Sequence, residues 1–463
     1  MQRQRKFNAA LTVDAISSLP NTILSRILSL LPIKEAVATS ILSKRWIHVW
    51  HTVDSIDFPD ITTLNSIESI IIFNKFMDSV LVSRDAADSH FIKNFRLKIK
   101  YGNRNLARNL GFSNVTKWID LVIVQRGLKY FCLHLLDADN VTYDDDDDDD
   151  DDDGDGEDGD DDDDEDDEDD GDDDDDDDDD EEDGDDDDVI GQKPSLPISI
   201  LSYRTLVSLD LAGFCVKGFT FSSIGFGFPS LNVLHLDHIV FQTIRDFMLF
   251  LAGCPNIEDL RATHIYFCDE GDSLTIQEFE SLSLPKLISA VITQFWWSCF
   301  PVKALSNSKY LFLETSMLCT KDHEVYEMDQ PQCPCNDIPI FHNLTHLELY
   351  DRVELVLQTL QHCPMLQNLE LHQEPFEELE DEEYDLQNWV EPEVVPQCLS
   401  SHLRTCTIYN FEGKQSELML IKYILKNARN LQVMRIEIGC DHPEIKTEVS
   451  TCPRPLQCQV FWF

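Results

Sequence analysis

The sequence predicts a mixed α/β protein in which a small helical domain at the N-terminus is followed by a curved array of strand units. Three observations support this fold class. Residues 19–50 carry the apolar periodicity of helices within a short segment. Beyond residue 90, short leucine patterns recur along the chain. Residues 144–188 contain 40 Asp or Glu and 5 Gly, which predicts a disordered acidic loop inserted in the array.

The first helix of the N-terminal domain is expected between two prolines, Pro20 and Pro32. Proline is tolerated in the first turn of a helix, whereas a later proline disfavours helical backbone at the residue before it. Over these three turns, one arc of the helix is apolar and the opposite arc is polar. The apolar arc consists of Ile23, Leu24, Ile27, Leu28, Leu30 and Leu31.

Two shorter helices are expected next, one from Ile33 to Val37 and one that begins after Ser43 as its N-cap. On the third helix, Trp46, Val49 and Trp50 share one face. A domain of about 45 residues is marginal alone and usually needs a disulfide, a metal or a partner. Because this segment contains no cysteine, either a partner protein or the rest of the chain must cover the apolar stripe.

The segment from Leu19 to Trp46 resembles the F-box of plant F-box proteins. The matching features are Leu19-Pro20, the spaced isoleucines that follow, and the sequence LPIKEAVATSILSKRW. The resemblance implies that this domain docks on the Skp-type adaptor of a cullin-based ubiquitin ligase. The adaptor contacts that it implies are Leu19, Pro20, Ile23, Ile27, Leu31, Val37, Leu42 and Trp46.

Short strands with leucine or a substitute at positions 1, 4 and 6 recur after residue 90. Measured between neighbouring clear copies, the starts lie 25, 26 and 22 residues apart, within the range of leucine-rich repeats. One unit can bury its leucines only against a stacked neighbour, so we expect a solenoid with a parallel sheet on its concave face. The clear copies start at Leu206, Leu231, Ile257, Leu344 and Leu366, and weaker ones lie near Phe95, Leu128, Leu287 and Leu311.

The concave face is the expected target-binding surface, because positions 3, 5 and 7 of each strand point away from the buried leucines. Buried aromatic and arginine anchors dominate many interfaces, so Tyr350 and Arg261 are the best single candidates. The histidines on this face are more often plain polar residues than metal ligands. The full set of candidate target-binding residues is Asp210, His235, Asp237, Arg261, Glu348, Tyr350, Glu370 and His372.

The acidic stretch dominates the charge of the chain. It contributes −40 of the net charge of −52, so the other 418 residues carry −12. With this tract and no compensating basic stripe, direct binding to nucleic acid is disfavoured by phosphate repulsion. Three interpretations remain open for the tract: a neutral expansion in solvent, attraction of basic partners such as histones, or weak binding of Ca²⁺.

The C-terminal residues 395–438 predict a helix with Leu418, Ile421, Leu425 and Ala428 on one face, followed by a strand. This segment resembles the FBD region of many plant F-box proteins. The chain continues beyond the expected end as residues 441–463, for which the sequence offers no structural prediction. The matching positions are Cys398, Leu399, Leu403, Gly413, Glu417, Tyr423, Leu425, Asn427, Ala428 and Leu431.

The sequence contains no phosphate-binding glycine loop, no His-Glu-x-x-His and no Gly-x-Ser-x-Gly. Cys333 and Cys335, with His323 and His342 nearby, lack the paired spacing of a structural zinc site, so we expect loop thiols, no metal and no cofactor. The cysteines are scattered along a chain with no signal-like leader and no long apolar segment, which predicts reduced thiols in the nucleus or cytoplasm and no membrane contact.

The predicted function is that of a non-catalytic substrate-recognition subunit of a Skp–cullin–F-box ubiquitin ligase, with an unidentified target protein on the repeats. The alternative is an acidic chromatin- or histone-binding scaffold that uses the Asp-rich tract without ligase activity. The predicted divisions are 14–60 for the F-box, 61–143 for a linker helix and the first repeats, 144–188 for the acidic tract, 189–390 for further repeats, 391–440 for the FBD-like domain and 441–463 for the tail.

Overall fold

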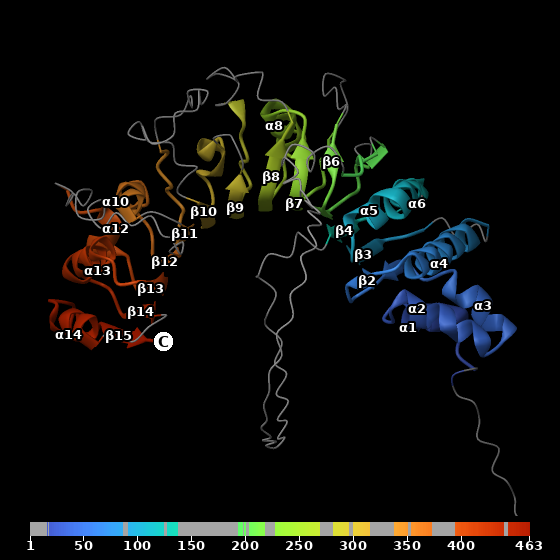
Figure 1. The fold of residues 1–463 in the computed structure, drawn as a ribbon, viewed down its shortest axis with the longest axis horizontal. Helices are drawn as coiled ribbons and strands as arrows, with labels where there is room; N and C mark the ends of the chain where they lie inside the picture. Colours follow the sequence, from blue (N-terminus) through green and yellow to red (C-terminus); the bar gives the residue numbers. More distant parts are fainter. Residues whose placement is uncertain are drawn as a thin grey trace, which may run out of the picture.

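A computed structural model gives the arrangement of the chain (Figure 1). The acidic stretch 144–188 and the segment with Cys333 and Cys335 lie outside the described residues. The described residues are 16, 18–86, 91–124, 127–137, 193–197, 199–200, 203–217, 227–268, 281–295, 300–314, 338–350, 353–372, 394–438 and 443–463.

Three helices and a short 3₁₀ turn form the N-terminal domain: α1 (Asn21–Leu28), α2 (Ile33–Ala38), η1 (Thr39–Ile41) and α3 (Lys44–Trp50). The helix that the two prolines predict is present, with Pro20 as its N-cap. It ends at Leu28, about one turn earlier than expected. Ser43 occupies the N-cap position of α3, but its side chain makes no capping hydrogen bond.

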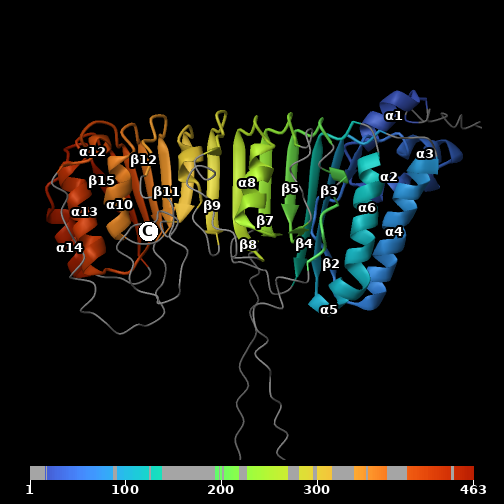
Figure 2. The ribbon, with the colours of Figure 1, turned by 90° about the horizontal axis from the view of Figure 1, so that it is seen from above.

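The rest of the described chain builds one parallel sheet of 15 strands, in which neighbouring strands largely follow chain order. The strands are β1 (Ser55–Asp57), β2 (Thr62–Leu64), β3 (Asn94–Tyr101), β4 (Tyr130–Asp137), β5 (Ser208–Ala212), β6 (Cys215–Val216), β7 (Val233–Phe241), β8 (Asp259–Phe267), β9 (Ser289–Phe295), β10 (Tyr310–Glu314), β11 (His346–Tyr350), β12 (Asn368–His372), β13 (Thr405–Phe411), β14 (Val433–Ile438) and β15 (Gln459–Trp462). Figure 2 shows them side by side, and Figure 1 shows them along the inside of an arch.

Helices cover the outer side of this arch, and the N-terminal domain lies at one end (Figure 1). These helices are α4 (Ile67–Ala86), α5 (Arg104–Leu106), the π-helical turn η2 (Ala107–Gly111), α6 (Phe112–Val124), α8 (Ile244–Ala252), η5 (Val302–Leu305), α10 (Val353–Gln361), α12 (Gln397–Ser401), α13 (Gln415–Asn427) and α14 (Pro443–Thr451). The predicted α/β class is therefore confirmed.

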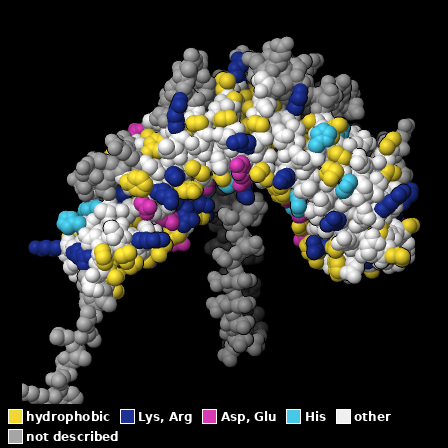
Figure 3. Space-filling model, turned by 180° about the vertical axis from the view of Figure 1, so that it is seen from behind, with side chains coloured by type: hydrophobic (Ala, Val, Ile, Leu, Met, Phe, Trp, Pro, Cys, Tyr) yellow, Lys and Arg dark blue, Asp and Glu magenta, His cyan; other side chains and the backbone are white. Residues whose placement is uncertain are grey.

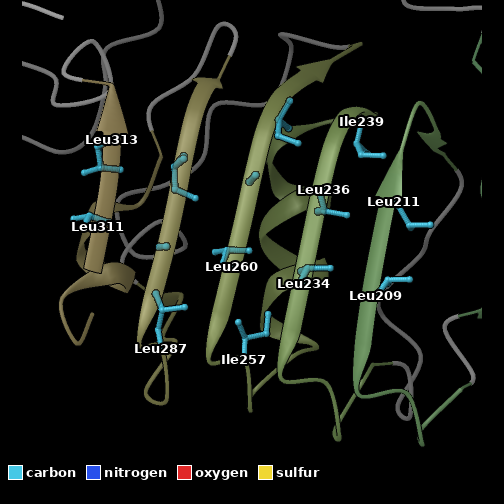
Figure 4. Packing of buried hydrophobic residues seen from close by; sticks show 14 of the residues in the cluster. Leu209, Leu211, Leu234, Leu236, Ile239, Ile257, Leu260, Leu287, Leu311 and Leu313 are labelled. Atoms are coloured by element: carbon cyan, nitrogen blue, oxygen red, sulfur yellow. The ribbon is translucent and has the colours of Figure 1, made fainter. Parts of the chain in front are cut away.

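Aliphatic side chains at alternate strand positions make the core. In Figure 4 the labelled leucines and isoleucines of β5, β7, β8 and β10 stack in rows on one side of the sheet. Leu209, Leu234 and Leu260 are pairwise in register and each is 0% exposed. Since successive residues of a strand point to opposite faces, the residues between these leucines lie on the inner, concave side.

A single hydrophobic core runs from the N-terminal domain to the last strand. It includes Leu24 and Trp50 of the first domain, Phe95 of β3 and Ile436 of β14. Every expected strand, including the weaker ones near Phe95 and Leu311, forms part of the sheet. None of the helices in the described part of the chain is long and apolar enough to cross a membrane.

The C-terminal residues beyond 440, which had no predicted structure, form one more unit of the array. Helix α14 packs on the core through Val449, and β15 pairs in parallel with β14. A Cys-Pro pair at Cys452 precedes this strand, as Cys-Pro pairs at Cys254 and Cys363 precede β8 and β12. The Cys-Pro pair could have predicted the additional strand, which begins seven residues after the cysteine here and five residues after it in the other two units.

Candidate interaction surfaces

Polar contacts between α1 and α3 fix the geometry of the N-terminal domain. Arg45 donates from Nε to the side-chain oxygen of Asn21 at 2.8 Å and also hydrogen-bonds the backbone oxygen of Leu19. Ser25 donates to the backbone oxygen of Thr52 at 3.1 Å. With its polar side tied to α3 in this way, α1 presents Ile23 and Ile27 to the outside.

The apolar arc of α1 divides into a buried half and an exposed half. Leu24 and Leu28 are 0% and 1% exposed, whereas Ile23 and Ile27 are 44% and 43% exposed. The described part of the chain therefore covers only part of the stripe. In Figure 3 hydrophobic side chains gather at the N-terminal end of the arch.

The structure separates the predicted adaptor contacts by exposure. Ile23, Ile27, Leu42 and Pro20 are exposed, and Leu19, Leu31 and Val37 are partly buried. Trp46 is 7% exposed and belongs to the core, because it lies on the face of α3 that packs against its neighbours. Its contact with an adaptor stays a prediction. Three further residues were not among the predicted contacts although they are exposed: Leu30 at 83%, Ile41 at 88% and Ile47 at 40%.

A buried arginine joins the N-terminal domain to the array. Arg84 of α4 is 1% exposed and donates to the backbone oxygens of Trp50, at 3.5 Å, and Phe91, at 3.0 Å. Burial lowers the pKa of its guanidinium to about 10, which still leaves it charged at neutral pH. Trp50 is the last residue of α3, where a helix terminus presents unpaired carbonyls and favours a cation.

Histidines and aspartates share the N-terminal half of the concave face. His134 Nε2 lies 2.7 Å from Asp210 Oδ1, and His235 Nε2 lies 3.3 Å from Asp259 Oδ2. Burial acts to raise the pKa of Asp210, but the hydrogen bonds from His134 and Cys132 and the charges of His134 and His235 together outweigh it, so the pKa lies below its ordinary value. Asp210 therefore stays ionised at neutral pH.

Tyrosines and glutamates replace that pattern in the C-terminal half. Glu348 accepts from Tyr310 Oη at 2.5 Å and lies 2.8 Å from His372 Nε2, and Tyr409 donates to Glu370 at 3.0 Å. The His372 ring stacks on Tyr409 with centroids 4.4 Å apart. Burial and the nearby Glu370 raise the pKa of Tyr409 to about 12, so its phenol keeps its proton as a donor.

All predicted target-binding residues lie at inward-facing positions of the strands, as alternation with the buried leucines requires. Arg261 is exposed and the others are half-buried. Tyr350 stacks against His372 with a centroid distance of 6.2 Å. The sequence could not show that these side chains bond to one another, because the partners come from different strands.

The C-terminal unit holds a buried carboxylate. Glu417 is 2% exposed and accepts hydrogen bonds from the backbone N–H groups of Gly413, at 2.9 Å, and Lys414, at 3.0 Å, at the start of α13. Its other oxygen has no hydrogen-bond partner among the described residues. Burial raises the pKa of this carboxyl to about 7 even though the two N–H groups favour the ionised form.

Comparison with known proteins identifies both ends of the chain. A family model for the F-box domain matches residues 16–57, and one described as FBD matches residues 391–436. An FBD-associated F-box protein of Arabidopsis thaliana is 23% identical, with 95% of this chain and 94% of that protein covered. A putative F-box/FBD/LRR-repeat protein of the same plant is 23% identical, with 93% and 92% covered, and an F-box/FBD/LRR-repeat protein is 25% identical, with 91% and 92% covered.

Proposed function

We propose that this chain, an F-box protein with a C-terminal FBD domain, is the substrate-recognition subunit of a Skp–cullin–F-box ubiquitin ligase. F-box domains generally bind Skp1-type adaptors, and F-box proteins generally act as non-catalytic adaptors of ubiquitin ligases. In this role the chain supplies proximity and orientation, while other subunits carry out the transfer of ubiquitin. It would work in the nucleus or the cytoplasm.

The observation that carries this proposal is the exposed apolar group of the F-box. Ile23, Ile27, Leu30, Ile41 and Leu42 lie within 20 residues of one another in the chain and all are more than 40% exposed. Large exposed apolar clusters mark sites that a partner covers. An apolar groove on a Skp-type adaptor would remove these side chains from water.

The target would bind the concave side of the sheet. We interpret the strand units as leucine-rich repeats, which two of the Arabidopsis relatives carry in their names. Inner faces of such arrays are extended binding surfaces. The residues proposed to contact the target remain Asp210, His235, Asp237, Arg261, Glu348, Tyr350, Glu370 and His372.

A double substitution tests adaptor docking. Ile23→Asp with Ile27→Asp places two charges in the apolar contact, and we expect it to abolish co-purification with a Skp-type adaptor. The matched control is Ile288→Asp with Ile340→Asp, since these isoleucines are 44% and 52% exposed and lie far along the chain. The control adds the same charge and should keep the adaptor.

Unaltered adaptor affinity in the Ile23 and Ile27 variant would contradict the proposal. Circular dichroism and thermal melting establish that the variant is folded, since both side chains are already exposed in the free chain. A chain that never captures an adaptor yet binds histones through residues 144–188 would favour the acidic scaffold instead. Deletion of that tract separates the two cases.

A further inference from the structure

The concave face carries two clusters of side chains with metal-ligand chemistry. Among the described residues, two groups of three place one possible ligand atom from each member within 4.8 Å of one another. One consists of Asp237, His238 and His264, and the other of Cys132, His134 and Asp210. The target-binding role proposed above needs neither group to hold a metal.

Backbone conformation distinguishes the first group. His238 and His264 both have φ of 50°, in the left-handed region that residues other than glycine seldom adopt. Asp237 pairs with Ala212 on one side and Thr263 on the other, so the residues that follow these three occupy equivalent steps of β5, β7 and β8.

The equivalent position directly after β5 is a glycine, Gly213, which has φ of 80°. A Cβ at that position would lie 2.1 Å from the backbone oxygen of Leu135. Glycine adopts this conformation without steric cost, yet β7 and β8 use histidine there. Strained positions of this kind cluster at functional sites, so the two imidazoles call for a role of their own.

The donor atoms of the three residues converge. His238 Nδ1 and His264 Nδ1 each lie 2.9 Å from the same atom, Oδ1 of Asp237, and the two rings stack with centroids 4.0 Å apart. Thr263 donates to that same oxygen at 2.8 Å.

We propose that Asp237, His238 and His264 bind a divalent transition-metal ion of the zinc class on the concave face. Two imidazoles and one carboxylate form a donor set that suits such ions and leaves room for water or a further ligand. With bonds of about 2.0–2.1 Å, tetrahedral ligands lie about 3.3 Å apart, so each distance of 2.9 Å from a histidine Nδ1 to Asp237 Oδ1 must open by about 0.4 Å. The stacked imidazoles must also rotate so that both nitrogen lone pairs face the ion.

Access and support also fit a bound ion. The side chain of His238 is 6% exposed while that of Asp237 is 37% exposed, so the site is enclosed on one side and open on the other. Thr263 is positioned to orient the carboxylate, as groups around metal ligands commonly do. Lys193 donates to the backbone oxygen of His238 at 2.9 Å and thereby holds the strand at this step.

The second group is the less suitable one. Its Asp210 divides its oxygens between Cys132 Sγ, at 3.2 Å, and His134 Nε2, at 2.7 Å. Arg96 and Lys98 of β3 pair in register with Cys132 and His134, so two cations adjoin these ligands, compared with Lys193 beside the first group. Burial and the neighbouring Asp210 raise the pKa of the Cys132 thiol, which opposes the thiolate that a metal needs.

Zinc titration of the full chain, stripped with a chelator, tests the assignment. Excess Mg²⁺ in the buffer occupies carboxylates of the acidic tract but competes poorly for imidazole nitrogen. We expect one tight equivalent of Zn²⁺, weakened more than about 10-fold in His264→Asn and in His238→Asn. Asparagine tolerates the left-handed conformation, so both variants should fold, which thermal melting without metal verifies.

Matched variants and a spectroscopic probe complete the test. His235→Asn, on the same strand but outside the group, and Cys132→Ser should both retain the zinc equivalent. Replacement by Co²⁺ should give no thiolate charge-transfer band, because no sulfur is a ligand. The assignment is overturned if no tight equivalent is found, if His264→Asn binds zinc as the unaltered chain does, or if a thiolate band appears and Cys132→Ser removes it.

Discussion

The F-box and the concave face differ in how far the chain itself satisfies their side chains. Ile23 and Ile27 of the F-box are apolar and 44% and 43% exposed, so the described part of the chain leaves much of their surface in water. Glu348 and His372 on the concave face are half-buried and already bonded to neighbours. A partner of the F-box gains by removing apolar surface from water, whereas a partner of the concave face must match or replace existing hydrogen bonds.

This difference teaches that the two surfaces should respond to mutation in opposite ways. Loss of an exposed F-box side chain should affect binding and leave folding intact. Loss of a networked residue on the concave face leaves a polar neighbour without a partner, so binding and stability change together. The first surface suits an adaptor of fixed identity, and the second suits discrimination between targets.

The largest effect is expected inside the F-box. Leu24→Ala removes a side chain that is 0% exposed and should lower the free energy of unfolding by about 2–5 kcal/mol. Ile23→Ala, one residue away, should change it by less than about 0.5 kcal/mol while weakening adaptor capture. Chemical denaturation and adaptor binding measured on both variants check the contrast. Similar stability losses in the two would mean that the α1 stripe is covered within the chain.

In the FBD domain, the buried carboxyl of Glu417 should make the stability of the fold depend on pH. The pKa of this carboxyl is about 7 when folded against 4.5 ordinarily, so the folded state binds the proton more tightly. The stability that the protonated group contributes is present below pH 4.5 and is lost as the pH rises through 7. By linkage the loss approaches about 3 kcal/mol.

Glu417→Gln keeps an acceptor for the two N–H groups and carries no charge. We expect it to be more stable than the unaltered chain at pH 8 and to approach it as the pH falls to 5. Urea denaturation across this range measures the difference. A difference in unfolding free energy that is the same at every pH would contradict this. It would show that Glu417 stays ionised throughout and that other interactions offset the cost of burying its charge.

An intermediate effect is expected for the two proposed anchors on the concave face. Tyr350→Ala and Arg261→Ala should each weaken target binding by about 2 kcal/mol without affecting the adaptor. Tyr130→Ala is a control, since this tyrosine is 46% exposed on β4 at the other end of the sheet. If both anchor variants capture the target fully while changes within 395–438 prevent capture, recognition belongs to the FBD domain.

The smallest effect on folding is expected for the most exposed residues of the F-box. Ile41→Ser and Leu42→Ser remove side chains that are 88% and 64% exposed, so thermal stability should stay within about 0.5 kcal/mol. Adaptor affinity should nevertheless fall. A marked drop in melting temperature would mean that these side chains make contacts within the chain. It would contradict the view that exposed F-box side chains serve binding and not folding.

The strands could be predicted because their leucines recur at fixed positions, as Leu209 and Leu234 show. The face of α3 could be predicted too, but a helical wheel gives direction and not depth, so it did not show that Trp46, an adaptor contact by resemblance, lies in the core of the free chain. The Asp237 group could not be predicted. His264 lies 27 residues from Asp237, and only the register of β7 with β8 and two left-handed residues bring them together.

Arg84 has a mechanical consequence for the proposed ligase. Because this buried cation hydrogen-bonds the Trp50 carbonyl at the end of α3 and the Phe91 carbonyl beyond α4, a rotation of the F-box on the arch would leave the charge of Arg84 with fewer partners. The distance between the adaptor-binding F-box and the target-binding concave face would then be nearly constant. Lysines of the target would be selected by their distance from the donor enzyme, so a tightly held protein whose lysines lie out of reach would be bound and yet spared.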